Sequence, residues 1–258
     1  MCLINFKFQN HPKYQLIVAA NRDEFYERPT APADFWSDHP SILAGRDLLG
    51  HGTWLGISKE GRFAALTNYR DVKEMRDDKN TRGEIVSRFL ISNESIDTYQ
   101  QILVNTGDLY NGYNLIFGTP DELFYYNNIE NKITKLEKGL HSVSNHFLNT
   151  PWPKVVKGKQ LLDQYTSDTE HVSPELLFEF LQNDETAKDE RLPNTGVGIE
   201  LERQLSPLFI KTDGYGTRCS TVLLITNEGQ VLFKERTYVN GRFCDEKSYT
   251  FELPQVLN

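Results

Sequence analysis

The chain begins MCLINFKFQNHPKYQLIVAANRDEF, residues 1–25, and this stretch predicts the kind of fold that follows. Hydrophobicity alternates over residues 2–8, and residues 14–20 are mostly apolar. Turn-forming residues at 10–13 separate the two segments, so the stretch predicts a β-hairpin whose second strand ends in the polar run at 21–24. We therefore expect a fold rich in antiparallel strands.

Further strands are predicted along the chain. The clearest hairpins have glycine-containing turns at residues 59–61 and 227–229. The strands predicted beyond the first hairpin are 53–58, 62–67, 113–118, 123–127, 133–136, 219–226 and 230–237. Residues 28–40 are rich in Pro, Asp and Ser, and we expect them to form a loop.

Several segments have the pattern of helices. Thr81 and Glu84 form a capping box ahead of apolar residues that continue to position 90. Ser95 is expected to cap a short helix through residue 103. Ser173 precedes a proline and an acid, which is typical of a helix start. The predicted helices are completed by 174–181 and 152–165, and residues 183–198 are expected to be an irregular surface loop.

The order of these elements predicts the fold class. Strands, helices, strands, helices and strands follow one another, and hairpins dominate among the strands. We therefore expect an α+β fold of mainly antiparallel sheets with helices outside them. No solenoid repeat, low-complexity tract or linker divides the 258 residues, so we expect a single domain over residues 1–258.

Composition argues against several classes of partner and compartment. The net charge is −8 and no run of Lys or Arg interrupts it, so we expect neither nucleic acid nor anionic membranes as partners. The longest apolar stretches, 16–20 and 221–225, are far too short to span a bilayer. Three cysteines and a start without a secretory pattern favour reduced thiols in the cytoplasm. The oligomeric state is left open.

Cys2 lies directly behind the initiator methionine, where it can become the N-terminus of the chain. Removal of Met1 would leave one residue with a thiol and a free α-amine, and such an amine has a pKa of about 7.7–8.0. It can then accept the proton of the thiol near neutrality, which is the device of N-terminal-nucleophile hydrolases. The alternative is that Cys2 is a small apolar residue of the first strand.

Four consecutive polar residues, Asn21, Arg22, Asp23 and Glu24, end the second predicted strand. Strand alternation sends Arg22 and Glu24 to one face and the other two to the opposite face. A guanidinium near Cys2 would favour the thiolate, and a carboxylate nearby could hold the α-amine. The alternative is a solvated strand end with a salt bridge.

Two asparagines and an arginine lie at the ends of other predicted strands. Asn68 ends the strand at 62–67, and Asn145 follows a short polar run. A side-chain amide in such a place can donate to a developing oxyanion, although most such asparagines form turns. Arg218 opens the strand at 219–226 between small residues, where a surface ion pair is the alternative.

Other chemistries lack their motifs. The chain contains no HExxH or CxxC, no GxGxxG or GxxxxGK[ST], and no GxSxG. We therefore expect neither a metal ion nor a nucleotide cofactor. His141 and His146 are read as incidental.

The Met-Cys start, the tetrapeptide at 21–24 and the stretch Gly-Thr-Trp-Leu-Gly at 52–56 resemble the NRDE-motif family, also called the transport and Golgi organisation family. The run Ala-Ala-Leu-Thr-Asn-Tyr-Arg-Asp at 64–71 adds to the match, and the resemblance spans nearly the whole chain. Members of that family have been linked to lipid, acyl-CoA or haem handling without a settled reaction.

More distantly, the layout is similar to the cysteine N-terminal-nucleophile amidases of the penicillin acylase and bile-salt hydrolase type. That resemblance implies a four-layer αββα sandwich. It also implies Cys2 as nucleophile, Arg22 as its electrostatic partner, Asp23 orienting the α-amine, Asn68 and Asn145 contacting the oxyanion, and Arg218 bracing the site. In the amidases two residues separate the arginine from the aspartate, whereas here the two are adjacent, so Glu24 remains an alternative to Asp23.

The leading functional hypothesis is hydrolysis of a linear amide, or of a thioester, through an acyl-enzyme on Cys2. The rival is a binding or carrier protein that holds a hydrophobic ligand, such as an acyl chain, acyl-CoA or haem, on the same sandwich. A high aromatic content, 12 % of the chain, suits an apolar pocket, but it suits an ordinary core equally well.

Overall fold

The computed structural model describes residues 2–71 and 76–254, and within these ranges the strands form two antiparallel sheets. Sheet A has the order β10 (Gly139–Val143), β1 (Cys2–Phe8), β2 (Tyr14–Phe25), β11 (Tyr215–Thr226), β12 (Gln230–Val239) and β13 (Arg242–Glu252). Sheet B has the order β3 (Thr30–Phe35), β4 (Ile42–Asp47), β5 (Leu55–Ser58), β6 (Phe63–Asn68), β7 (Tyr113–Thr119), β8 (Glu122–Asn127) and β9 (Lys132–Lys135).

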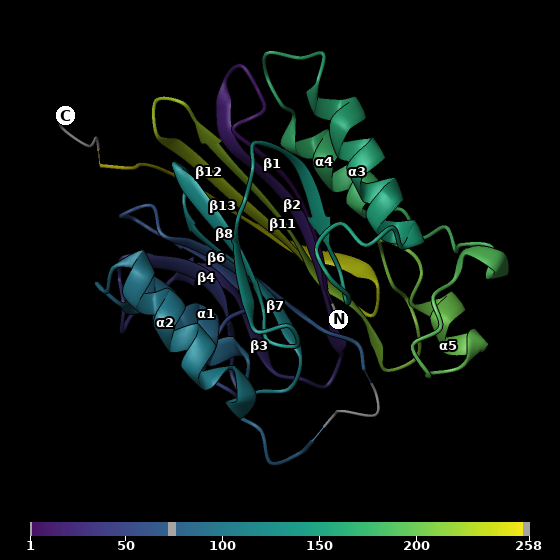
Figure 1. The fold of residues 1–258 in the computed structure, drawn as a ribbon. Helices are drawn as coiled ribbons and strands as arrows, with labels where there is room; N and C mark the ends of the chain where they lie inside the picture. Colours follow the sequence, from purple (N-terminus) through teal and green to yellow (C-terminus); the bar gives the residue numbers. More distant parts are fainter. Residues whose placement is uncertain (1, 72–75, 255–258) are drawn as a thin grey trace.

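The two sheets lie face to face, and helices cover their outer faces (Figure 1). Helices α3 (Pro153–Thr166) and α4 (Pro174–Leu181) pack on sheet A. Helix α1 (Gly83–Ile91) packs on sheet B, with α2 (Ile96–Thr106) beside it. The short α5 (Ile199–Gln204) precedes β11. This is the four-layer αββα sandwich that the resemblance implied, so the fold expectation is confirmed.

Strand β1 lies at the centre of the packing because both of its faces are buried. Ile4, Phe6 and Phe8 alternate toward the core between the sheets, whereas Leu3 packs toward the helices of the outer layer. A one-residue slip of its register would place the buried polar side chains of Asn5 and Lys7 in that apolar core. The register of β1 is therefore strongly specified.

The first, second and third predicted hairpins are confirmed as β1–β2, β5–β6 and β11–β12. The loop expected at residues 28–40 is wrong in part, because β3 occupies Thr30–Phe35. This strand lies at the edge of sheet B, and its pairing with β4 is irregular between Ala31 and Asp34. An edge position tolerates Pro32, which cannot donate to a neighbouring strand. Strands β4, β10 and β13 were also not expected.

Helix starts differ from the predictions in detail. Ser95 accepts a hydrogen bond from the backbone N–H of Thr98, so its predicted cap is confirmed. The predicted capping box before α1 is wrong, since the N-cap is Arg82 and the carboxylate of Glu84 accepts from the Tyr110 hydroxyl instead. Helix α4 begins at Pro174 with Ser173 at its N-cap, as expected, although the Ser173 side chain makes no capping hydrogen bond. Helix α3 begins at Pro153, within the predicted segment 152–165, and α5 follows the irregular segment 183–198.

Helix α3 approaches sheet A through Gly158, which lies over the buried side chain of Asn5 in β1. A Cβ at position 158 would lie 2.8 Å from Cγ and 2.9 Å from Nδ2 of Asn5. Hydrogen bonds to Ala19 and Ser142 hold that amide in place. Glycine in mid-helix therefore allows the close approach of the two layers.

We expect Gly158→Ala to destabilise the protein by about 1–3 kcal/mol, because the added methyl group would displace a buried amide. Gly→Ala in an unobstructed helix stabilises by about 1 kcal/mol, so the sign of the change is diagnostic. Denaturant unfolding measures it. Gln160→Ala, at an exposed position of the same helix, should stay within about 0.5 kcal/mol of the wild type. A stabilised Gly158→Ala protein would contradict the packing described here.

Candidate active site

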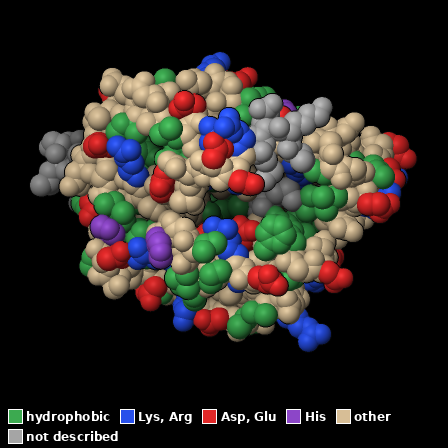
Figure 2. All heavy atoms as spheres, turned by 90° about the horizontal axis from the view of Figure 1, so that it is seen from below, with side chains coloured by type: hydrophobic (Ala, Val, Ile, Leu, Met, Phe, Trp, Pro, Cys, Tyr) green, Lys and Arg blue, Asp and Glu red, His purple; other side chains and the backbone are tan. Residues whose placement is uncertain are grey.

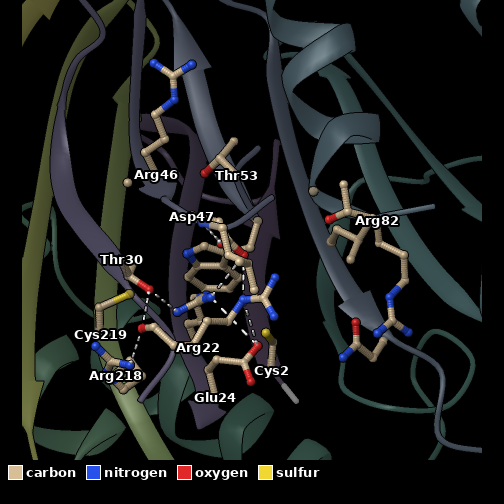
Figure 3. A pocket seen from close by; sticks show the side chains of 18 of the residues that line it. Cys2, Arg22, Glu24, Thr30, Arg46, Asp47, Thr53, Arg82, Arg218 and Cys219 are labelled. Carbon is tan, nitrogen blue, oxygen red and sulfur yellow. Dashed lines mark hydrogen bonds and ion pairs between the residues drawn. The ribbon is translucent and has the colours of Figure 1, made fainter. Parts of the chain in front are cut away.

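The register of sheet A aligns two cysteines on either side of an arginine. Cys2 on β1 and Cys219 on β11 are both paired with Arg22 on β2. Directly paired residues of neighbouring antiparallel strands project their side chains on the same face of the sheet. Both cysteines belong to the core between the two sheets, and Figure 3 shows Arg22 between them. The β1–β2 hairpin thus brings Cys2 next to the Asn-Arg-Asp-Glu segment at residues 21–24, which we call the NRDE run.

A cavity of about 540 Å³ opens over this row of side chains. Sheet A contributes Cys2, Arg22 and Cys219, and the opposite wall includes Trp54 and Asn68 from the β5–β6 region. The face on which β1 begins is hollowed, with hydrophobic and basic side chains around the hollow (Figure 2). The candidate nucleophile therefore lies in a cavity that a small organic molecule can occupy.

Arg22 belongs to a set of four charged residues that we call the arginine network: Arg22, Glu24, Arg28 and Asp47. Its Nη1 donates to the Thr30 hydroxyl at 3.3 Å, and its Nη2 lies 3.8 Å from Glu24 and 4.0 Å from Asp47. Arg28 binds Asp47 at 2.7 Å and lies 3.9 Å from Glu24. Two guanidinium groups thus face two carboxylates, which compensates the cost of placing Arg22 where its side chain is 8 % exposed.

The Asp47 carboxylate is held charged by the turn that follows β4. Burial acts to raise its pKa, but the backbone N–H of Gly50 and the Arg28 guanidinium donate hydrogen bonds that leave the pKa below its ordinary value. This fixed carboxylate orients the guanidinium of Arg28, and it also lies 4.0 Å from Nη2 of Arg22. Asp47 was not expected from the sequence, because an Arg-Asp pair at the end of a short strand is not a recognisable motif.

Asp23 and Glu24 both border the cavity, but their carboxyl groups have different partners. Glu24 faces Arg22 and Arg28, whereas Asp23 accepts a hydrogen bond from the Thr217 hydroxyl at 2.7 Å. Asn21 binds carbonyl groups on the helix side of the sheet, as the predicted alternation requires, whereas Asp23 also borders the cavity. The buried position of Asp23, 1 % exposed, raises its pKa.

The Cys2 thiol is buried at the start of β1. Burial raises its pKa, and the negative charge of Asp23 acts in the same direction, while Arg22 opposes both. The hydroxyl of Ser144 donates to the carbonyl of Cys2 at 3.0 Å and fixes the main chain there. A thiol in this environment is protonated near neutral pH, so nucleophilic attack requires a base.

The two asparagines are placed differently. Asn68 lines the cavity at the end of β6, and β6 packs face to face with β1. Asn145 is fully buried behind it, and its Nδ2 donates to the main-chain carbonyl of Asn68 at 2.9 Å. The hydroxyl of Ser144 donates to Oδ1 of Asn145 at 3.1 Å. Asn145 therefore holds the segment that carries Asn68 and lies outside the described lining of the cavity.

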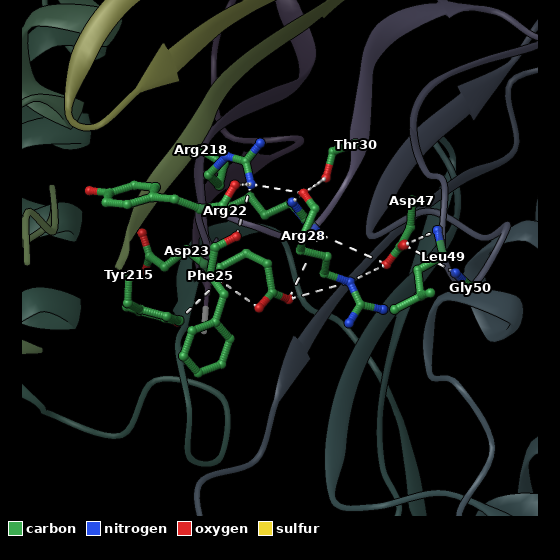
Figure 4. A network of polar contacts seen from close by, with 12 residues as sticks. Arg22, Asp23, Phe25, Arg28, Thr30, Asp47, Leu49, Gly50, Tyr215 and Arg218 are labelled. Carbon is green, nitrogen blue, oxygen red and sulfur yellow. Dashed lines mark hydrogen bonds and ion pairs between the residues drawn. The ribbon is translucent and has the colours of Figure 1, made fainter. Parts of the chain in front are cut away.

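Arg218 fastens the turn that follows β2 (Figure 4). Its Nη1 donates to the carbonyl groups of Phe25, Tyr26 and Arg28 at 2.9–3.0 Å. These bonds fix the backbone immediately after Glu24, and Arg218 also borders the cavity. Of the predicted residues, the structure brings to one cavity Cys2, Arg22, Asp23, Asn68 and Arg218.

Further polar groups of the site were not expected from sequence. Arg82, at the start of α1, borders the cavity and donates from Nη1 to the carbonyl of Gly112. Glu235 on β12 is buried at 2 % exposure, and its carboxylate accepts a 2.7 Å bond from the Ala33 N–H. Burial raises the pKa of Glu235. Neither residue lies in a recognisable motif, because each is brought to the cavity by strand order alone.

Within residues 2–71 and 76–254, no group of three or more His, Cys, Asp or Glu side chains is arranged to hold a metal ion. Among the helices of these ranges, none combines the length and the apolar character needed to cross a bilayer.

Sequence comparison identifies relatives over almost the full length of the chain. The family described as "Transport and Golgi organisation 2" matches residues 1–240. The mouse "Transport and Golgi organization 2 homolog" is 35% identical over 98% of this chain and 99% of its own length. The human homolog is 35% identical over the same shares, and the bovine homolog is 37% identical over 93% of this chain and 94% of its own.

Solved structures with a similar arrangement are much more distant in sequence. A Caenorhabditis elegans N-acylethanolamine-hydrolyzing acid amidase ortholog matches with a TM-score of 0.49 at 10% identity, over 86% of this chain and 92% of its own. The C2A mutant of the conjugated bile acid hydrolase from Clostridium perfringens matches with a TM-score of 0.44 at 10% identity, over 100% and 99% of the two chains.

The buried carboxyl group of Glu235 predicts a measurable pH dependence of stability. Its pKa is raised above the ordinary value of 4.5 in the folded protein, so the native state retains a proton that the unfolded state has lost. Wild-type protein therefore loses stability as pH rises from about 4.5 to the native pKa. We expect Glu235→Gln to remove this loss, so that the variant gains on the wild type over that interval in denaturant unfolding.

Glu228→Gln supplies the control, because Glu228 is exposed in the turn between β11 and β12. Its unfolding free energy should follow the wild type across the whole pH range. A Glu235→Gln protein with an unchanged pH slope would show that the carboxyl group carries no ionisation penalty.

Proposed function

The chain belongs to the Transport and Golgi organisation 2 family, and we propose that it is an N-terminal-cysteine hydrolase that cleaves a linear amide or thioester bond. The observation that carries this proposal is the pairing of Cys2 with Arg22 on the floor of a cavity whose opposite wall presents Asn68. A nucleophile, a cation and an amide donor converge there, as acyl transfer requires.

The first half of the proposed reaction forms an acyl-enzyme. After removal of Met1, the α-amine of Cys2 takes the thiol proton while sulfur attacks the carbonyl carbon of the substrate. The tetrahedral oxyanion that results accepts a hydrogen bond from the Asn68 side chain. Collapse breaks the carbon–nitrogen or carbon–sulfur bond, the protonated amine returns its proton to the leaving group, and an acyl-thioester on Cys2 remains.

The second half repeats these steps with water. The α-amine takes a proton from water, the oxygen attacks the thioester carbon, and the carbon–sulfur bond to Cys2 breaks as the free acid leaves. Sulfur regains a proton from the amine, so the enzyme returns to its starting state. Burial that raises the thiol pKa supports the need for such a base in each half-reaction.

Asp23 is the better candidate than Glu24 for orienting the α-amine. Glu24 is engaged by two guanidinium groups of the arginine network, while the charge of Asp23 acts on the Cys2 thiol. In this scheme Arg22 stabilises negative charge on sulfur, Asn145 supports Asn68 from behind, and Arg218 holds the end of the NRDE run. We also propose that the protein works in the cytoplasm, which suits a buried thiol nucleophile kept reduced.

A carrier function is the second candidate, and the apolar part of the cavity favours it. Trp54, Leu66 and Cys219 give the cavity a hydrophobic wall that can hold an acyl chain or another apolar ligand. A carrier would retain such a ligand without turning it over. The two functions therefore differ in the fate of Cys2.

Replacement of Cys2 separates the two functions. We expect Cys2→Ala to abolish turnover of N-acyl amides and acyl-thioesters of varied chain length while leaving the thermal unfolding midpoint nearly unchanged. The side chain lost is small, so no large cavity results. Cys219→Ala, which alters the other cysteine paired with Arg22, is the matched control and should remain active. Full activity of Cys2→Ala would remove the catalytic claim.

Thiol labelling supports the same test without a known substrate. Because Cys244 is exposed, labelling is done in a Cys244→Ser background with an acylating probe, and intact mass reports whether Met1 has been removed. Selective modification of Cys2 over the buried Cys219 is expected of a hydrolase. No modification together with tight retention of an apolar ligand is the outcome expected of a carrier.

The amide of Asn68 gives an independent prediction. We expect Asn68→Ala to lower kcat by about 10²–10³-fold with little change in KM, because the lost donor acts on the oxyanion. Steady-state kinetics measure the change. Asn111→Ala, which alters another amide that borders the cavity, should reduce kcat far less. Equal effects of the two changes would argue against an oxyanion donor at position 68.

A further inference from the structure

Arg70 is a buried arginine that the proposed mechanism has not used, although it lies only two residues after Asn68. Its side chain is 8 % exposed, and its Nη1 binds Oε2 of Glu202 at 2.7 Å. The guanidinium also lies over the Trp152 ring, 5.0 Å from the ring centroid. Nε and Nη2 find no hydrogen-bond partner among the residues that the structure describes. The ion pair with Glu202 therefore offsets much of the cost of burying this cation.

Glu202 is the one buried residue of α5. The apolar side chains of Ile199 and Leu201 in the same helix are 49 % and 41 % exposed, whereas Glu202 is 3 % exposed. A helix that packs by the hydrophobic effect buries its apolar residues instead. Oε1 of Glu202 accepts hydrogen bonds from the N–H and the hydroxyl of Thr195 at 2.8 and 2.6 Å. The reversed pattern indicates that α5 is held here through its carboxylate.

The ion pair completes the attachment of residues 68–70. Nδ2 of Asn145 donates to the carbonyl of Asn68 at 2.9 Å, and the N–H of Arg70 donates to the carbonyl of Asn145 at 2.8 Å. The N–H of Tyr69 donates to the carbonyl of Gly112 at 2.9 Å. These three bonds fix the main chain to the loops before α3 and β7. The Arg70 side chain adds a fourth attachment, which runs to α5.

The side chain of Asn68 has no such attachment of its own. It borders the cavity, and none of the residues within 2–71 and 76–254 hydrogen-bonds its amide. An amide without a protein partner is free to bind a ligand, and its direction is set by the main chain that carries it. The rigidity of residues 68–70 therefore decides how well this donor is oriented.

We propose that Arg70 and Glu202 are positioning residues that hold the Asn68 amide in the direction needed by an oxyanion formed at Cys2. Neither is among the described residues that border the cavity, so neither contacts substrate. A donor oriented in advance stabilises the oxyanion without reorganising, and a misplacement of about 1 Å caused by a distant change can cost about 10²-fold in rate. The inference rests on the proposed function in one respect: the pair affects turnover only if Asn68 acts on the oxyanion.

The direct test is the side-chain ¹⁵N–¹H resonance of Asn68, assigned by its loss in Asn68→Ala. We expect Glu202→Gln to shift this resonance, because a neutral amide cannot form the ion pair that anchors Arg70. Glu200→Gln makes the same change on α5 at a side chain that is 79 % exposed, and it should leave the resonance in place. An unmoved resonance in Glu202→Gln, or equal shifts in the two variants, overturns the proposal.

Two milder variants decide the matter if Glu202→Gln does not fold. Thr195→Val removes the hydroxyl that donates to Glu202, whereas Thr195→Ser keeps it. We expect the Asn68 resonance to move in Thr195→Val and to stay at the wild-type position in Thr195→Ser. The same position in both variants overturns the proposal just as firmly.

A double-mutant cycle measures the effect on turnover. Glu202→Gln should lower kcat by about 10–10²-fold with little change in KM, because it loosens a donor that acts in the transition state. In an Asn68→Ala background the same change should lower kcat no further, since the amide that the pair positions is gone. Equal reductions in the two backgrounds would show that the pair acts elsewhere and would overturn the proposal.

The resonance and the kinetics together separate this proposal from the proposed function. A resonance that moves only in Glu202→Gln, combined with undiminished turnover in Asn68→Ala, supports Arg70 and Glu202 as the residues that hold Asn68. That combination would show that the oxyanion role of Asn68 is the claim that fails.

Discussion

The site depends on one constraint, the antiparallel register between β1 and β2 that sets Cys2 opposite Arg22. Because strand side chains alternate, a slip of one residue would turn the thiol toward the helices and place Asn21 or Asp23 beside it. The two faces of β1 prevent such a slip because they differ: the side chains in the core between the sheets are apolar, whereas Asn5 and Lys7 on the other face bind Ser142 and Asp163. The core therefore fixes the geometry of the chemistry as well as the stability of the fold.

The structure buries two groups of charge that have different partners. On the cavity side, the arginine network pairs two guanidinium groups with two carboxylates. A second buried ion pair joins Arg70, which follows β6, to Glu202 of α5 at 2.7 Å, and the Arg70 guanidinium also lies over the Trp152 ring. Within each group the positive and negative charges balance, and this balance offsets the desolvation free energy of burying them beside an apolar core.

The relatives and the geometry contribute different kinds of knowledge. Relatives at 35–37% identity establish the family over nearly the whole chain. The cavity bears on activity because Cys2 and Asn68 both line it. A hydrolase would use the Cys2 thiol as its nucleophile, whereas a carrier would only enclose its ligand.

The sequence alone determined the hairpins, the class of antiparallel sheets with helices outside them and the nucleophile candidate, because alternating hydrophobicity and a Met-Cys start are local patterns. The four-layer sandwich was implied by the family resemblance. The sequence also placed Arg22 on the correct face of its strand, since alternation has a fixed period. Only the tertiary structure decided that Asn145 supports Asn68 instead of lining the cavity, and that Asp47 and Arg82 border the cavity. Their neighbours are distant in sequence, so long-range packing of sheets and helices, which no local pattern encodes, brings them together.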